Sequence, residues 1–389
     1  MSSLIPDHLM QLWGGTEATF GAGGAASPAT GDAFDHLNFD PGPMGGPEII
    51  PNLEKTGSRG YGIPVQGSHV PRSPKVGVYA KGSGVATTPV DFAFLFKAAG
   101  FTETVGGADV SYARTLIPAT SAWLWSASAN GEVGFSYAGV VVNEIKITAE
   151  DLAKFEFSLE AAKVSAFYKT TLNGAVSIGG GSLTLAADHG CVLPTGGAPL
   201  YAKIDSEEVK ITAISGNTAT LSAVLTANHS DGATVTASVP ARTVSSQLPV
   251  SVANCLFDIN AGASELTVLK WEATIKTGVR LLEKEAHNAF RTGFVGERPG
   301  EDAVRLNADF YYTVTAGTAK LHQKFANKTS ASVRGSVGES AGNIIRINAT
   351  SAYIVEPPTA PEIDNGPRQG SVVFGGYGST GADVSIVTL

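Results

Sequence analysis

The chain has 389 residues, of which 43% are hydrophobic and 16% charged, and its net charge at pH 7 is −8. This length allows a large core and two or three domains. An acidic chain without any cluster of Lys or Arg argues against a protein that grips nucleic acid by neutralising phosphates. The 46 Gly and 20 Pro lie among short alternating segments, which predicts a mainly β fold with many turns.

The first residues, the hydropathy and the cysteines of the chain indicate the cellular compartment to expect. Residues 1–7 lack the basic region and apolar run of a signal peptide. The sequence also has no run of about 18 apolar residues, the length that would be needed to span a membrane. We therefore expect a soluble protein that is made in a cytoplasm and has no membrane partner. Cys191 and Cys255 lie in segments that we assign to different domains, so we expect small buried thiols and no disulfide.

Residues 1–70 are predicted to form an N-terminal arm with extended loops. This segment has little periodicity and is rich in Gly and Pro, as in 21–24 and 40–47. Its apolar anchors are too many for a free linker, so we expect it to lie across another surface, such as a neighbouring subunit. The anchors are Leu12, Trp13, Phe20, Phe34, Leu37, Phe39, Ile49 and Ile50.

The segment 88–100 is the one clear helix prediction. Thr88 can cap the N-terminus of the helix and Pro89 suits its first position. The carboxylate of Asp91 suits the N-terminus, where the helix dipole is positive. Gly100 supplies the stop. One face of the helix is apolar at the i, i+3, i+4, i+7 spacing and should pack against a sheet. This predicts a single helix that flanks a β-barrel or sandwich. That face carries Phe92, Leu95, Phe96 and Ala99.

Residues 71–170 are predicted to form the first part of the main β-domain, and 171–242 a small inserted β-domain. Alternating segments predict strands of the first part as an antiparallel meander; they are 75–81, 123–125, 132–147 and 154–159. From 171 the strands become rich in Gly, Ala and Thr, with a tight turn at 215–218. We expect the insert to fold independently and to lie on the outer surface.

Residues 243–389 are predicted to form the second part of the main β-domain with the C-terminal strands. Alternation in 264–278 predicts one face with Leu269, Trp271, Ala273 and Ile275. The segment 281–290 is charged and predicts a short helical turn. Further strands are predicted at 250–260, 304–314, 343–355, 371–374 and 382–389.

One catalytic motif is spelled out in 338–342, where Gly-Glu-Ser-Ala-Gly matches G-x-S-x-G. A nucleophile elbow needs a strand before the Ser and a helix after it. The residues after Ser340 alternate as a strand, and the last histidine is His322, so the order Ser, acid, His cannot be built. A plain turn is the better interpretation.

Other motifs also favour a protein without a chemical site. Residues 21–26 fit a loose dinucleotide fingerprint but lack the flanking strand and helix, and no phosphate-binding loop occurs. The histidines lack metal-ligand spacing; they are His8, His36, His69, His189, His229, His287 and His322. We therefore predict no enzyme activity and no catalytic, cofactor-binding or metal-binding residues, hence no cofactor.

The order of several segments resembles the tail tube (major tail) protein of long-tailed bacteriophages. The similarity covers most of 10–170 and 243–389; the segments are 17–21, 75–101, 154–159, 276–280 and 293–299. Separately, the 190–237 module resembles a β-element common in phage structural proteins. Its position inside the chain departs from the simplest tube proteins, which suggests an external decoration.

The resemblance implies a tail-tube-type β-barrel or sandwich flanked by one helix. It further implies hexameric rings that stack helically into a tube in the virion tail, assembled in the host cytoplasm. Expected partners are copies of the chain and the tape measure, tail terminator and distal tail proteins. Genomic DNA would pass through the lumen without specific binding, which suits an acidic chain because like charge lets DNA slide.

Two alternatives remain open, besides an esterase as a formal third option that a Ser340→Ala variant with unchanged hydrolysis would remove. The same fold could form the tube of a gene-transfer particle, a tailocin or another injection machine, which neighbouring genes would distinguish. The chain could instead be a carbohydrate-binding or adhesive β-protein at a tail tip. Copy number per particle would separate these, because a tube needs many copies and a tip only a few.

Overall fold

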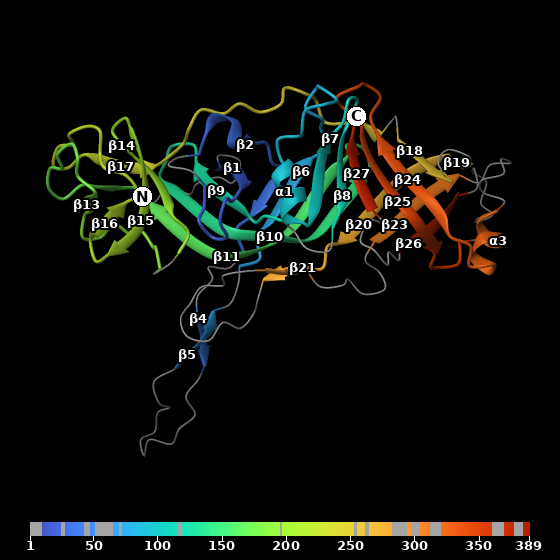
Figure 1. Ribbon diagram of the computed structural model, residues 1–389, viewed down its shortest axis with the longest axis horizontal. Helices are drawn as coiled ribbons and strands as arrows, with labels where there is room; N and C mark the ends of the chain where they lie inside the picture. Colours follow the sequence, from blue (N-terminus) through green and yellow to red (C-terminus); the bar gives the residue numbers. More distant parts are fainter. Residues whose placement is uncertain are drawn as a thin grey trace, which may run out of the picture.

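The computed structural model describes residues 10–24, 28–42, 47–50, 65–69, 72–115, 119–194, 197–252, 255–260, 264–281, 294–296, 304–311, 320–359, 369–376 and 384–389. Within them the fold is mainly β, which confirms the predicted class. The described residues form a large antiparallel sheet, a six-stranded sheet, two separate hairpins and only short helices (Figure 1).

The large sheet collects strands from both ends of the chain. β23 buries every second side chain and its sequence shows the period of two, whereas β9 is buried on both faces. Its strands are β1 (Met10–Thr16), β2 (Ala33–Phe34), β3 (Asn38–Asp40), β6 (Lys75–Tyr79), β7 (Phe101–Val105), β8 (Val110–Arg114), β9 (Ala122–Ser128), β10 (Val133–Ala149), β11 (Lys154–Tyr168), β18 (Leu256–Ile259), β19 (Ser264–Leu266), β20 (Val268–Lys276), β23 (Val304–Tyr311), β24 (Ala331–Val337), β25 (Ile345–Ile354), β26 (Gln369–Gly376) and β27 (Val384–Thr388).

The remaining elements of the described residues are a second sheet, two hairpins and three short helices. The six-stranded sheet contains β12 (Thr170–Thr171), β13 (Ser182–Thr184), β14 (Leu200–Ile204), β15 (Glu207–Ser215), β16 (Thr218–Leu221) and β17 (Thr234–Ala237). The hairpins are β4 (Pro47–Ile50) with β5 (Val65–His69), and β21 (Val279–Leu281) with β22 (Phe294–Gly296). The helices are η2 (Thr30–Asp32), α1 (Ala93–Ala98) and α3 (Leu321–Ala326).

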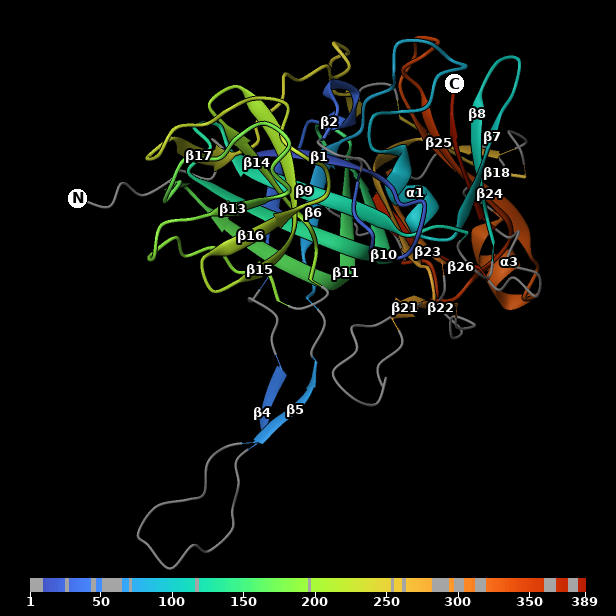
Figure 2. The ribbon, with the colours of Figure 1, turned by 60° about the vertical axis from the view of Figure 1, so that its left-hand side comes forward.

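The long strands β10 and β11 form the centre of the large sheet, paired from Val133 opposite Tyr168 to Thr148 opposite Lys154. The other edge of β10 holds β9 near its start and β20 near its end. From β20 the pairing continues through β23 and β26 to β25, which also pairs with β24 and β27. The sheet curls like a barrel around α1 (Figures 1 and 2).

The helix prediction is wrong in length and in its cap. α1 begins at Ala93 rather than at Thr88, and Phe92 precedes it without a side-chain cap. The carboxylate of Asp91 does not cap the helix, because its Oδ2 accepts a hydrogen bond from the Ser245 amide at 2.7 Å. The predicted stop is confirmed, since Gly100 has a φ of +84° just after the helix.

The apolar face of α1 packs into the aromatic centre of the large core. Phe96 lies 5.6 Å from Phe155, 5.7 Å from Phe157 and 4.9 Å from Tyr112 between ring centroids. Phe92, which was predicted to share that face, is also buried here. The expectation of a single helix is wrong, because α3 provides a second one.

The alternation predicted for β20 is confirmed except at Leu269. Trp271, Ala273 and Ile275 are buried, but Leu269 is 37% exposed. The register with β23 shifts between Val268 and Lys270, so Leu269 is the extra residue of a β-bulge and turns outward.

Much of the predicted arm folds into the chain's own sheet. β1 pairs with β9 and with β2, and β3 pairs with β6. Leu12, Trp13 and Phe34 are fully buried in cores of the same chain. The β4–β5 hairpin, by contrast, projects away from the body (Figures 1 and 2). Among the described residues, no helix combines the length and apolar character needed to cross a bilayer.

The six-stranded sheet has the predicted 215–218 turn, where Ser215 pairs with Thr218. It shares a hydrophobic cluster with β1 and β9. Tyr201 lies 5.4 Å from Trp125 between ring centroids, and the Trp125 indole donates to the Ser238 carbonyl at 2.8 Å. The division at 171 and 242 into separate domains stays a prediction. The predicted helical turn at 281–290 lies almost wholly outside the described residues.

Candidate functional site

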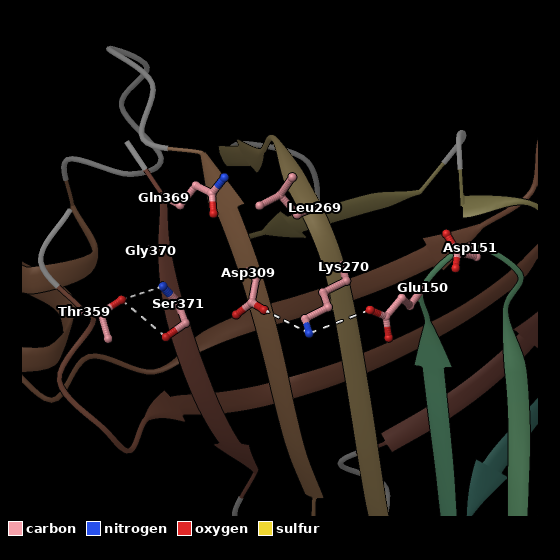
Figure 3. A pocket seen from close by; sticks show the side chains of 9 residues that line it. All are labelled: Glu150, Asp151, Leu269, Lys270, Asp309, Thr359, Gln369, Gly370 and Ser371. Carbon is pink, nitrogen blue, oxygen red and sulfur yellow. Dashed lines mark hydrogen bonds and ion pairs between the residues drawn. The ribbon is translucent and has the colours of Figure 1, made fainter. Parts of the chain in front are cut away.

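A surface cavity of about 640 Å³ opens beside β20, β23, β26 and the β10–β11 turn (Figure 3). At its centre, the Lys270 ammonium lies 3.6 Å from the Asp309 carboxylate and 4.0 Å from that of Glu150. The Ser371 amide donates to the Thr359 hydroxyl at 2.7 Å. These charges compensate one another at an exposed surface, where such pairs contribute about 0–1 kcal/mol. These contacts join the ends of neighbouring strands. None of them places a nucleophilic side chain beside a general base.

Ser340 lies in a turn between β24 and β25, as predicted. Its carbonyl accepts from the Asn343 amide at 2.8 Å, and the next element is the strand β25 rather than a helix. Gly342 has a φ of +83°, and a Cβ there would lie 2.3 Å from the carbonyl carbon of Gly84. The glycine of this motif is therefore explained by close backbone packing.

Glu17 is a buried carboxylate whose role the sequence patterns did not reveal. It accepts hydrogen bonds from the amides of Gly21 and Gly23, both at 2.9 Å, and of Gly139 at 3.0 Å. The Ser121 hydroxyl donates to it at 2.5 Å. The Gly-rich loop thus folds around Glu17 and is tied to β10. No local pattern could reveal this, because Gly139 is 122 positions away.

The described histidines do not converge. His189 accepts from the Cys191 amide at 3.0 Å through Nδ1, and His322 is exposed on α3. His229 stands apart, because it lies between the carboxylates of Asp205 and Glu207. In the described ranges no group of three or more His, Cys, Asp or Glu side chains could hold a metal ion. His8, His287 and the side chain of His69 lie outside the described residues.

Both cysteines are free. Burial raises the pKa of the Cys191 thiol, and it raises that of Cys255 to about 11. Thiols with raised pKa values are largely protonated near neutral pH and are poor nucleophiles.

The surface feature with the clearest capacity for interaction is the set of strand edges. In the described part of the chain β2, β3, β7 and β19 each pair with a single strand. β7 is the longest of the four, and its Thr102, Thr104 and Val105 are exposed. The β7–β8 hairpin stands at the margin of the molecule (Figure 2). Such an edge offers unpaired backbone groups to a strand of another chain.

The edges of the six-stranded sheet are joined instead. Its two outer strands are β12 and β13. Leu172 directly follows β12, Leu185 directly follows β13, and an antiparallel bridge joins these two residues. The Asn173 amide donates to the Thr184 carbonyl at 2.8 Å, and Ala186 donates to Thr171 at 2.9 Å. This sheet therefore rolls up and leaves little edge for a partner strand.

No protein-family model matches the chain, and no curated protein matches it either. The function must therefore be inferred from the chain's own residues and structure.

Proposed function

We propose that the chain is a structural, non-enzymatic subunit of hexameric rings that stack into the tail tube of a long-tailed bacteriophage. The tube would be the conduit for DNA from capsid to host cell. The observation that carries this proposal is the large sheet, in which four strands have a single partner each among the described residues. An open edge favours association with further strands unless a neighbour covers it. Identical copies arranged in a ring would cover the edges of one another.

Two further features support the proposal. The net charge of −8 suits a channel wall, because like charge repels the DNA phosphates and lets them pass. The β4–β5 hairpin projects from the body (Figure 1), which suits contact with an adjacent ring. The tube would end against tail terminator and distal tail proteins and enclose the tape measure protein during assembly.

The edge of β7 provides a direct test. We would replace Thr102 and Thr104 together by Lys, since edge lysines block strand addition. The matched control replaces Thr218 and Thr220 by Lys on β16, which has partners on both edges and equally exposed threonines. Negative-stain electron microscopy and size-exclusion chromatography would follow assembly.

We expect stacked rings with an open lumen for the native chain and for the β16 control, and unassembled subunits for the β7 variant. A native chain that stays monomeric under all conditions, and in virions is found outside the tube, would overturn the proposal. Normal tubes from the β7 variant would show that another edge makes the contact.

A further inference from the structure

His229 is a buried histidine whose two ring nitrogens both face carboxylates. It lies in the loop between β16 and β17, and the residue is 5% exposed. Nδ1 lies 2.9 Å from an oxygen of Asp205, and Nε2 lies 2.8 Å from an oxygen of Glu207. A carboxylate only accepts hydrogen bonds, so both contacts are hydrogen bonds only when both nitrogens donate, that is, when the imidazole is protonated.

This cluster fixes two loops, 174–181 and 222–233, which we call the latch loops. Glu207 also accepts hydrogen bonds from the amide and hydroxyl of Thr226, at 2.6 and 2.8 Å, and from the Ala227 amide at 3.2 Å. The backbones of His229 and Val176 exchange two hydrogen bonds of 2.9 Å. Glu207 thus holds one latch loop, and His229 joins that loop to the other.

The charged groups around His229 come from few elements. Asp205 and Glu207 belong to the β14–β15 turn and the start of β15. The 174–181 loop has no ionisable side chain. In the loop of His229 itself, Asp231 is engaged with the Gly174 amide at 2.7 Å. Burial alone would lower the pKa of His229, but the hydrogen bonds and charges of the two carboxylates raise it above its ordinary value.

We propose that protonated His229 is a latch that holds the latch loops against the β14–β15 turn, and that its deprotonation at rising pH releases them. The neutral ring could donate from one nitrogen only, and the other would direct its lone pair at a carboxylate. Ile178 and Val224, which are 62% and 61% exposed, lie on these loops. Release would therefore move these two exposed apolar side chains together with their loops.

The direction of the pH effect follows from the raised pKa. A group whose pKa is higher in the folded state stabilises that state. The stabilisation is fully present at pH values below the group's unfolded-state pKa, which is about 6.5 for histidine. This stabilisation is lost as pH rises through the folded value. The latch loops should therefore be closed in mildly acidic solution and open in alkaline solution.

Hydrogen exchange of the full chain, followed by mass spectrometry at pH 6 and pH 9, tests the latch. With rates corrected for the intrinsic effect of pH, we expect protection of 222–233 to fall about tenfold or more, the change that one pKa unit represents. Peptides from β20 and β23 should keep their protection. Equal protection of 222–233 at both pH values would overturn the proposal.

Variants separate the latch from general stability. The His229→Gln variant should show low protection at both pH values. If it fails to fold, Asp205→Asn still tests the proposal, because the Asp205 side chain is 56% exposed and its loss should move the transition to lower pH. His189→Gln is the matched control and should leave the transition in place. An unmoved transition in Asp205→Asn would contradict the latch.

Discussion

The six-stranded sheet joins its own outer strands through the bridge between Leu172 and Leu185, whereas the large sheet leaves four strands with one described partner each. A sheet with joined edges can face solvent without pairing with further strands. An open sheet edge exposes unpaired backbone groups that can pair with a strand of another chain. In the tube that we propose, the assembly contacts would therefore belong to the large sheet. The smaller sheet is then free to carry an outward role such as the latch.

The two regions differ in their cores as well as in their edges. The large core is built around α1 with the rings of Phe92, Phe96, Phe155 and Phe157. The small core is not self-contained, because Tyr201 packs on Trp123 and Trp125 of β9. Deleting residues 171–242 would expose these indoles. Closed edges and an independent core are separate properties.

The largest expected effect comes from the centre of the large core. Phe96→Asp would bury an unpaired carboxylate among aromatic rings, which costs several kcal/mol, so we expect no soluble folded subunit. Val85→Asp is the control, because Val85 is 55% exposed. Soluble yield and circular dichroism would measure both. A folded Phe96→Asp subunit would show that α1 is dispensable.

A smaller effect is expected where the two sheets meet. Tyr201→Ala should lower the free energy of unfolding by about 3–5 kcal/mol, as for other buried aromatic side chains. Tyr201→Phe loses only the hydroxyl that accepts from the Gly24 amide at 2.7 Å, and should cost about 1 kcal/mol. Denaturant titration should show one shared transition in the native chain, and two separate transitions would refute a shared core.

The smallest effect is expected on the wet face of the large sheet. Lys146 pairs with Glu272 at 3.2 Å, and both side chains are about one-third exposed. Removing an exposed pair of this kind changes stability by about 0–1 kcal/mol, so Lys146→Ala should nearly match the native midpoint of denaturation. A large loss would mean that this face is covered in the protein as purified.

The strands were more predictable than the helices and the site. Alternation located β11, β20, β23 and the second half of β10, which bury one face against the core, whereas residues 136–142 of β10 are all buried. The helix was predicted too long, because Asp91 bonds to Ser245 instead of capping and the helical turn starts only at Ala93. α3 was missed, since its short polar sequence buries only Leu321.

The buried carboxylate and histidine clusters could not be predicted from local patterns. Glu17 meets Gly139, and His229 meets Asp205, through folding that brings distant positions together. The outward turn of Leu269 depends on a register shift with β23 that alternation alone does not encode.

Cryo-electron microscopy of the native particle tests the central claim most directly. We predict that the map places this chain in the repeating wall of a hollow tube, with the open edges of the large sheet covered by neighbouring copies and the six-stranded sheet on the outside. A map that places the chain as a few copies at a tail tip, or outside any tube wall, would contradict the account.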